Sequence, residues 1–292
     1  MNRYKNALTL MRIPFSVYLM PVFWFALSTL AAFDVWRALA VFVILHLLVY
    51  PASNGYNSYY DRDEGSIGGL KQPPKVTPQL LYLVWLFDAL SVVLSLLLSP
   101  LFAALVVVYL LVSKAYSYRG IRLKKHPILS TLVVTLFQGA FTYGMVQTGV
   151  GITAYKVLQT PNLWFALVST LFLCGSYPLT QIYQHDEDRR RGDRTLSLLL
   201  GIRGTYLFAA VSLAAGACLL LWLYLSLHQV RNIFIFLICT GPILYFFSGW
   251  VLRSLRDVRA VNYENTMQMN KISSVCISIA FFTITLLHLL VI

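Results

Sequence analysis

Long apolar stretches separated by short polar segments dominate this sequence. A helix needs about 20 mostly apolar residues to cross the hydrocarbon core of a bilayer. The pattern predicts nine such spans, at 13–33, 37–58, 78–98, 101–118, 128–149, 162–183, 205–227, 232–252 and 272–291. We therefore expect an all-α membrane protein.

The composition agrees with a membrane environment. Of the 292 residues, 58% are hydrophobic and only 12% are charged, whereas a soluble domain has about 25% charged residues. No hydrophilic block is long enough for a separate domain, so we expect residues 1–292 to form one polytopic unit. The run at 13–33 exceeds the ~7–15 residues of a signal-peptide core and lacks a clear cleavage site, so we expect it to remain as the first span.

The basic residues predict how the chain is oriented. Nine spans place twenty of the 23 lysines and arginines on the side of the N-terminus and three on the other side. Because cytoplasmic loops have an excess of Lys and Arg, we expect a multi-pass protein of the inner or plasma membrane with a cytoplasmic N-terminus. The same bias explains the net charge of +12, so this charge does not indicate nucleic acid.

The acidic residues are clustered. Seven of the eleven fall in two short windows, both on the predicted cytoplasmic side. One window follows the second span and the other follows the sixth. Their members are Asp61, Asp63 and Glu64 in the first, and Asp186, Glu187, Asp188 and Asp193 in the second.

Polar residues precede both windows at helical spacing. Asn54, Asn57 and Asp61 are spaced i, i+3, i+7, so we expect them to share one helix face. The same argument predicts one face for the four residues Tyr177, Gln181, Gln184 and Asp188. Each of the two helices then presents an amide-rich face that ends in carboxylates. Both sets of carboxylates are expected at the same membrane depth.

Oxygen-rich helix ends are typical of magnesium sites. Mg²⁺ takes one or two carboxylates and fills its other positions with water and substrate phosphate. Ordinary solvated helix ends would explain one window, but they explain two equivalent windows less well. We therefore predict a Mg²⁺-bridged diphosphate, with the metal-ligand candidates Asn57, Asp61, Asp63, Glu64 and Asp188.

Charged residues near the third and fourth spans extend this interpretation. Arg122 and Lys124 follow the fourth span, where cations could stabilise a diphosphate leaving group; loop bias alone also explains each of them. Lys114 lies inside the fourth span, and an intramembrane charge is functional by default. Asp88 lies inside the third span and is expected to face another helix or a cavity rather than lipid.

Four segments resemble those of a known family. Asn57-Ser-Tyr-Tyr-Asp61 matches the start of an N-D-x-x-D-x-x-x-D motif after the second helix. Asp188-Arg189-Arg-Arg-Gly192-Asp-Arg194-Thr195-Leu196 matches the end of a D-x-x-x-D motif followed by R-x-x-G-x-R-T-L. Tyr118–Lys124 looks like the basic loop after helix four, and Arg12-Ile-Pro14 like the entry to helix one. On these residues, the chain resembles the UbiA superfamily of intramembrane prenyltransferases.

The resemblance implies a fold and a reaction. The fold would be a bundle of nine transmembrane helices around a central cavity that opens to the cytoplasmic side. The reaction would be Mg²⁺-dependent transfer of a polyprenyl group from polyprenyl diphosphate, within the lipid bilayer, to an acceptor that is small and aromatic (quinone-precursor-like) or a lipid. The catalytic residues implied are Asp61, Asp188 and Lys114. The substrate-binding residues implied are Asn54, Asn57, Arg12, Arg122, Lys124, Tyr177, Gln181, Gln184 and Arg194.

Two positions depart from the family pattern. Glycine occupies position 65 and glutamine occupies position 184, where the motifs have acids. Neighbouring acids could substitute for them. Two alternatives remain. One is a prenyltransferase homologue that binds its substrate without turnover, and the other is a cation-coupled transporter or lipid carrier. We also expect Gly65–Gly69 to be a flexible loop that closes over bound diphosphate, and the polar residues around 262–271 to precede the last span.

Overall fold

The structure is a computed structural model that describes residues 2–291, apart from the side chains of residues 2, 191 and 291. Within this part of the chain, the regular elements are helices and no strand forms. Among the described residues, nine helices are long and apolar enough to cross a membrane, which confirms the predicted all-α class and span count. They are Arg3–Ser28, Val35–Asp61, Pro78–Leu98, Pro100–Ser117, Pro127–Gly149, Thr160–Arg190, Leu196–Ser226, Val230–Arg256 and Tyr263–Leu290.

The described residues form two compact units. The first contains residues up to 17 together with 33–125 and 145–152. In it, α4 packs against α1, α5 and α6. Its helical elements are α1 (Asn2–Met11), α3 (Val35–Val43), the π-helix η2 (Ile44–Val49), α4 (Tyr50–Asp61), α5 (Pro78–Leu98), α6 (Pro100–Ser117) and η3 (Leu123–Lys125). The 3₁₀ helix η1 (Ile13–Leu19) begins in this unit.

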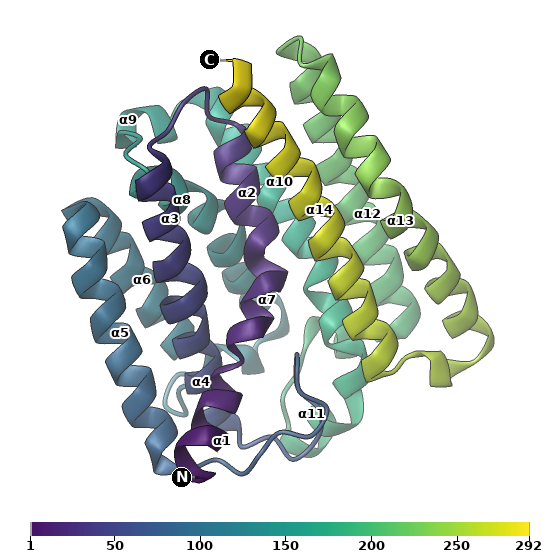
Figure 1. Cartoon of the computed structure of the whole chain (residues 1–292). Coiled ribbons are helices and arrows are strands. Elements are labelled where there is room, and N and C mark those ends of the chain that lie inside the picture. The colour runs from purple at the N-terminus through teal and green to yellow at the C-terminus, as the bar shows by residue number, and fades with distance from the viewer. Residues whose placement is uncertain (1, 292) are drawn as a thin grey trace. The chain divides into compact units, whose positions relative to one another are not determined.

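The second unit contains residues 18–32, 126–144 and those from 153 onward. In it, α14 packs against both α13 and α2, and α10 packs against α12; α13 and α14 run side by side in Figure 1. Its elements before the second acidic window are α2 (Met20–Ser28), α7 (Pro127–Leu136), the π-helix η4 (Phe137–Phe141), the start of α8 (Thr142–Gly149), α9 (Ala154–Val157) and α10 (Thr160–Ser176). The later elements are η5 (Pro178–Thr180), η6 (Ile182–Gln184), α11 (His185–Arg191), α12 (Leu196–Ser226), α13 (Val230–Arg256), η7 (Val258–Ala260) and α14 (Tyr263–Val291).

Prolines begin several of the spans. Pro78, Pro100 and Pro127 are each the first residue of a helix, where the missing N–H removes no intrahelical bond. A tight turn joins the third and fourth of these spans. Ser99 alone separates α5 from α6, and its Oγ accepts a hydrogen bond from Phe102 N–H at 3.0 Å as the N-cap of α6.

A glycine lets the helix of the first acidic window pack closely on its neighbour. A Cβ at Gly55 would lie 2.9 Å from Val84 Cγ2 and 3.2 Å from Leu80 Cδ1. Small residues permit such close helix contact in membranes. The core around this contact consists of Ala7, Leu10, Met11, Ala52, Tyr56, Leu80 and Val84. The position of α4 is therefore fixed by packing against α1 and α5.

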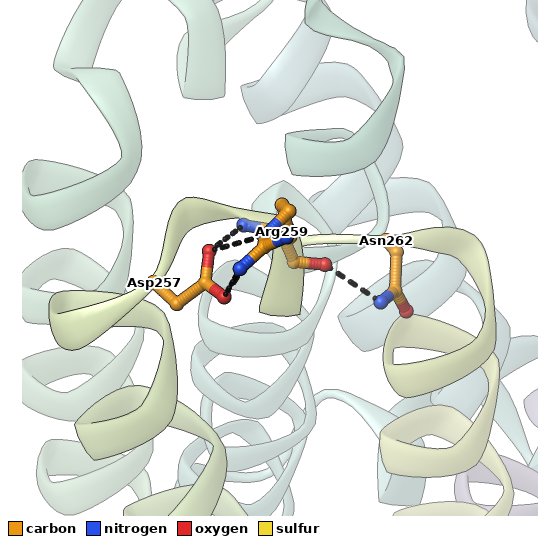
Figure 2. A network of polar contacts seen from close by, with 3 residues as sticks. All are labelled: Asp257, Arg259 and Asn262. Atoms are coloured by element: carbon orange, nitrogen blue, oxygen red, sulfur yellow. Dashed lines mark hydrogen bonds and ion pairs between the residues drawn. The ribbon is translucent and has the colours of Figure 1, made fainter.

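The last helix begins earlier than the sequence pattern predicts, at Tyr263 rather than near 272. Asn262 explains the difference, because its Oδ1 accepts a hydrogen bond from Asn265 N–H at 2.9 Å and so caps the helix. Asn262 Nδ2 also donates to Arg259 O at 2.8 Å, and Asp257 pairs with the Arg259 guanidinium (Figure 2). Most of the polar patch expected before the span therefore lies inside α14.

Candidate functional site

The first acidic window lies at the end of α4. Asn54, Asn57 and Asp61 all belong to this helix, as their spacing predicts. Arg62 follows with a φ of 51° and so ends the helix in the left-handed region. Asp61 is therefore the last helical residue, and the next acids stand on the loop.

Asp61 forms an ion pair with Lys124. The Lys124 ammonium donates to Asp61 Oδ1, and the two side chains are 10% and 6% exposed, respectively. Lys124 belongs to η3, a short 3₁₀ turn that follows α6. The structure thus joins a predicted metal ligand to a predicted diphosphate-binding cation.

Asn57 has a partner that the sequence did not reveal. Ser117 Oγ donates to Asn57 Oδ1 at 2.6 Å, and Ser117 is buried at the end of α6. No motif marks this serine. Its only sequence signal is its place three residues after Lys114, one turn along the same helix face.

The loop after α4, which we expect to close over bound diphosphate, packs against Arg12 and Phe15 in the structure. Arg12 has a φ of 51° and is buried, with Nη1 donating to Gly68 O at 3.0 Å and Nη2 to Asn54 O at 3.4 Å. Gly68 packs on a ring, since a Cβ there would lie 2.6 Å from Phe15 Cζ. Ile67 is buried and pairs with Leu70 in a tight turn. Arg12 thus connects α4 to its own loop.

Lys114 lies between a carboxylate and two aromatic rings. Its Nζ is 2.5 Å from Asp88 Oδ2. The same Nζ is 5.2 Å from the ring centre of Tyr56 and 5.3 Å from that of Trp85, distances typical of cation–π contacts. As expected, Asp88 faces another helix.

The residues that lead into the second acidic window do not form one α-helical face. The prediction that they share such a face is therefore wrong. The helix α10 ends at Ser176, and Pro178 opens the first of two 3₁₀ turns that precede α11. A 3₁₀ helix has about 3.0 residues per turn instead of 3.6. The α-helical spacing of Tyr177, Gln181, Gln184 and Asp188 therefore does not define a shared face.

Gln181, between the two 3₁₀ turns, and His185, the first residue of α11, contact the start of α12. Gln181 is buried, and its Oε1 accepts from Ser197 N–H at 3.3 Å. His185 Nε2 lies 2.7 Å from Ser197 Oγ. Ser197 is a second contact residue that the sequence did not reveal. The 3₁₀ turns are thus tied to the first turn of α12.

Asp188 organises the loop between α11 and α12. Its Oδ2 accepts from Thr195 Oγ1 at 3.2 Å, and its backbone carbonyl accepts from Asp193 N–H at 3.0 Å. Thr195 is in turn the N-cap of α12, because its Oγ1 accepts from Leu198 N–H at 3.3 Å. Gly192 has a φ of 69°, which allows this tight reversal.

The other predicted site residues are more accessible. Glu64 and Arg194 are exposed, while Asp63, Tyr177 and Gln184 are partly buried. Arg122 is also partly buried, with a φ of 45° two residues before Lys124. Among the residues whose side chains are described, no group of three Asp, Glu, His or Cys side chains is arranged to hold a metal ion.

Comparisons with known proteins agree with this fold. The model of the UbiA prenyltransferase family matches residues 18–272. An apo UbiA homologue from Aeropyrum pernix K1 is similar in structure, with a TM-score of 0.68 and 16% identity over 96% of this chain and 98% of that one. A UbiA homologue from Archaeoglobus fulgidus bound to GPP and Mg²⁺ has a TM-score of 0.64 and 16% identity over 96% of this chain and 99% of that one.

A third structure concerns digeranylgeranylglyceryl phosphate synthase in membranes. It has a TM-score of 0.59 and 17% identity over 98% of both chains. A search of curated proteins gives no match.

Proposed function

The chain belongs to the UbiA prenyltransferase family, and we propose that it transfers a polyprenyl group from its diphosphate to a small acceptor with the help of Mg²⁺. It is a multi-pass membrane protein with the UbiA fold. The observation that supports the reaction most strongly is the end of α4, where Asp61 lies beside the buried ammonium of Lys124. A carboxylate for metal and a cation for phosphate are thus held together.

The chemistry of the proposed ligands suits a magnesium ion. All five proposed ligands offer oxygen, which hard cations prefer, and Mg²⁺ needs only one or two of them because water and phosphate complete its shell. We propose the set Asn57, Asp61, Asp63, Glu64 and Asp188. When bound, the ion would neutralise charge on the diphosphate as its bond to carbon breaks. The Archaeoglobus fulgidus homologue bound to GPP and Mg²⁺ supports this choice of metal and ligand.

Basic side chains would stabilise the leaving group. In the proposed reaction, the allylic C–O bond breaks, the diphosphate leaves with the electron pair, and the acceptor carbon captures the cation and then loses a proton. Lys124 and Arg122 would bind the diphosphate from the turn after α6, and Arg194 from the loop before α12. A cation held in place before the reaction lowers the barrier more than one that must reorient.

The remaining site residues would shape the pocket. We propose that Tyr177 and Gln184 contact substrate, while Gln181 acts by fixing Ser197 and hence the start of α12. Arg12 and Asn54 would hold the loop after α4 near the same ligand.

We propose an aromatic acceptor related to quinone precursors, and a cytoplasmic N-terminus. The spacing Asn-x-x-Asn-x-x-x-Asp at 54–61 favours the acceptor class, and the excess of Lys and Arg supports the orientation. A lipid acceptor is the alternative, because digeranylgeranylglyceryl phosphate synthase has a similar fold. Parallel assays with a dihydroxynaphthoate and with a glycerol-phosphate lipid would separate the two classes.

A second candidate function is binding without turnover. Gly65 and Gln184 replace two motif acids, which leaves fewer carboxylates for metal. Such a homologue would retain prenyl diphosphate in a Mg²⁺-dependent way but would release no inorganic diphosphate. A cation-coupled transporter would show neither behaviour.

Diphosphate release tests the proposed function. The purified protein is incubated with labelled prenyl diphosphates of several chain lengths and an aromatic acceptor, with Mg²⁺ or with EDTA. We expect Mg²⁺-dependent release that is lost in Asp61→Ala and in Asp188→Ala.

Two aspartates outside the site provide matched controls. Asp34 caps α3, with Oδ1 accepting from Trp36 N–H at 2.8 Å, and Asp257 lies in the loop after α13. Asp34→Ala and Asp257→Ala should retain release. Release that is insensitive to EDTA, or that survives both site substitutions, would contradict the proposal.

A further inference from the structure

Two apolar spans of the first unit contain an ion pair. Asp88 of α5 and Lys114 of α6 are paired, and their side chains are only 10% and 13% exposed. Moving two charges out of water is costly, so a pair of this kind requires compensating contacts. Neither oxygen of Asp88 accepts a hydrogen bond of good geometry from any described residue. Lys114 is therefore the group that balances this carboxylate.

This dependence restricts what Lys114 can do. If its ammonium moved to a diphosphate, Asp88 would remain buried and uncompensated, which is strongly unfavourable. The cation–π contacts of Lys114 with Tyr56 and Trp85 also favour its present position.

The pair contacts the helix of the first acidic window. Tyr56 is buried on α4, immediately before Asn57, and its ring lies under the Lys114 ammonium. One turn further along α6, Ser117 donates to Asn57. Beyond the end of α6, Lys124 binds Asp61. Three successive polar contacts thus set the position of α4 against α6 and η3.

We infer that Asp88 and Lys114 form a positioning pair for α4: Asp88 holds the Lys114 ammonium against Tyr56, and this contact fixes Asn57 and Asp61 relative to α6. Lys114 then acts as a positioning residue and does not bind the diphosphate, in place of the catalytic role predicted from the sequence. The effect on turnover rests on the proposed function. The effect on folding stability rests on the ion pair alone.

A double-mutant cycle tests this inference. The variants are Asp88→Asn, Lys114→Met and the combination of both, with Lys156→Met as a control for loss of an exposed lysine. Thermal unfolding in detergent is measured first. Each single variant leaves one buried partner unmatched and should lower the unfolding temperature, whereas the neutral double variant should recover most of the loss. Additive losses would overturn the inference.

Steady-state kinetics distinguish positioning from diphosphate binding. We expect each single variant to lose about tenfold in kcat and to need more Mg²⁺, because misplaced ligands are poorly oriented. The KM for prenyl diphosphate should change little, and the double variant should regain most of kcat. If Lys114 bound the diphosphate, Lys114→Met and the double variant would both raise this KM, and the inference would fail.

Failure of the inference must be distinguished from misfolding of a variant and from failure of the proposed function. If the double variant does not fold, the exchanged pair Asp88→Lys with Lys114→Asp takes its place and should be more stable than either of its single variants. If the wild-type protein releases no diphosphate, the proposed function fails, while the unfolding temperatures still decide whether the pair exists.

Discussion

Lys124 and Asp61 are 63 residues apart in the chain, yet they form a buried ion pair between the turn after α6 and the last residue of α4. The pairing gives each side chain a fixed position before any ligand arrives. It also means that neither can be removed without leaving a buried charge. This relationship makes the end of α4 sensitive to substitution in a way that a solvated helix end is not.

Lys124→Met is therefore expected to destabilise the protein by about 3 kcal/mol, as when one partner of a buried pair is removed. Lys125→Met, the exposed neighbour on the same turn, should have little effect. Thermal unfolding in detergent measures both. The combination of Lys124→Met with Asp61→Asn should regain stability but no diphosphate release. Equal effects of the two lysine variants would contradict the pairing.

Ser117→Ala tests the second contact on α4. Without the hydroxyl, Asn57 Oδ1 loses its hydrogen bond, which we expect to cost about 1 kcal/mol because this acceptor is only partly buried. Mg²⁺-dependent release should fall as well, because Asn57 is a proposed ligand. Ser113→Ala on the same helix is the matched control. If both serine variants show the same release and unfolding temperature, the Ser117–Asn57 bond has no functional role.

The sequence pattern predicted the spans well because a membrane helix depends mainly on local apolar length. It also predicted the α4 face, since that helix keeps its α-helical spacing through Asp61. It failed between Tyr177 and Asp188 because Pro178 begins a pair of 3₁₀ turns.

The partners of the site residues were not predictable from single residues. Asn57 and its donor Ser117 are 60 positions apart, and Arg12 and its acceptor Gly68 are 56 apart. Such contacts depend on which helices pack together, and no local motif records them. The positions of Asp88 and Lys114 inside apolar spans indicated that each residue matters. Nothing in the sequence indicated that the two form a pair.

Gly68→Ala is expected to release the loop after α4. The new methyl group would meet Phe15 Cζ at 2.6 Å, so the ring or the loop must move. We expect faster tryptic cleavage of segment 62–77 in detergent, measured as the half-life of the intact chain. Phe15→Ala in the Gly68→Ala background makes room for the methyl and should slow cleavage again. Unchanged cleavage in Gly68→Ala would show that the loop does not depend on this contact.

The ion pair between Asp257 and Arg259, in the loop before α14, should make the unfolding temperature depend on pH. Arg259 donates to the Asp257 carboxylate with Nε at 3.1 and 3.0 Å from its two oxygens, and this bond holds the pKa of Asp257 below its usual value. Because the folded pKa is lowered, the stabilisation exists at neutral pH and is lost as pH falls through that pKa. The unfolding temperatures of wild type and Asp257→Asn should therefore differ at pH 7 and converge below about pH 4. A difference that persists in acid would contradict this assignment.

We propose that Asp61 and Asp188 act on the same Mg²⁺-bound diphosphate. Equilibrium binding of labelled geranyl diphosphate tests it most directly, with wild type, Asp61→Ala, Asp188→Ala and the double variant compared in Mg²⁺ and in EDTA. If both carboxylates serve one ligand, each single variant should bind at least about tenfold more weakly in Mg²⁺, and the double variant little worse than either, because coupled residues are not additive. Wild-type affinity in Asp188→Ala, or affinity that EDTA does not change, would contradict the claim.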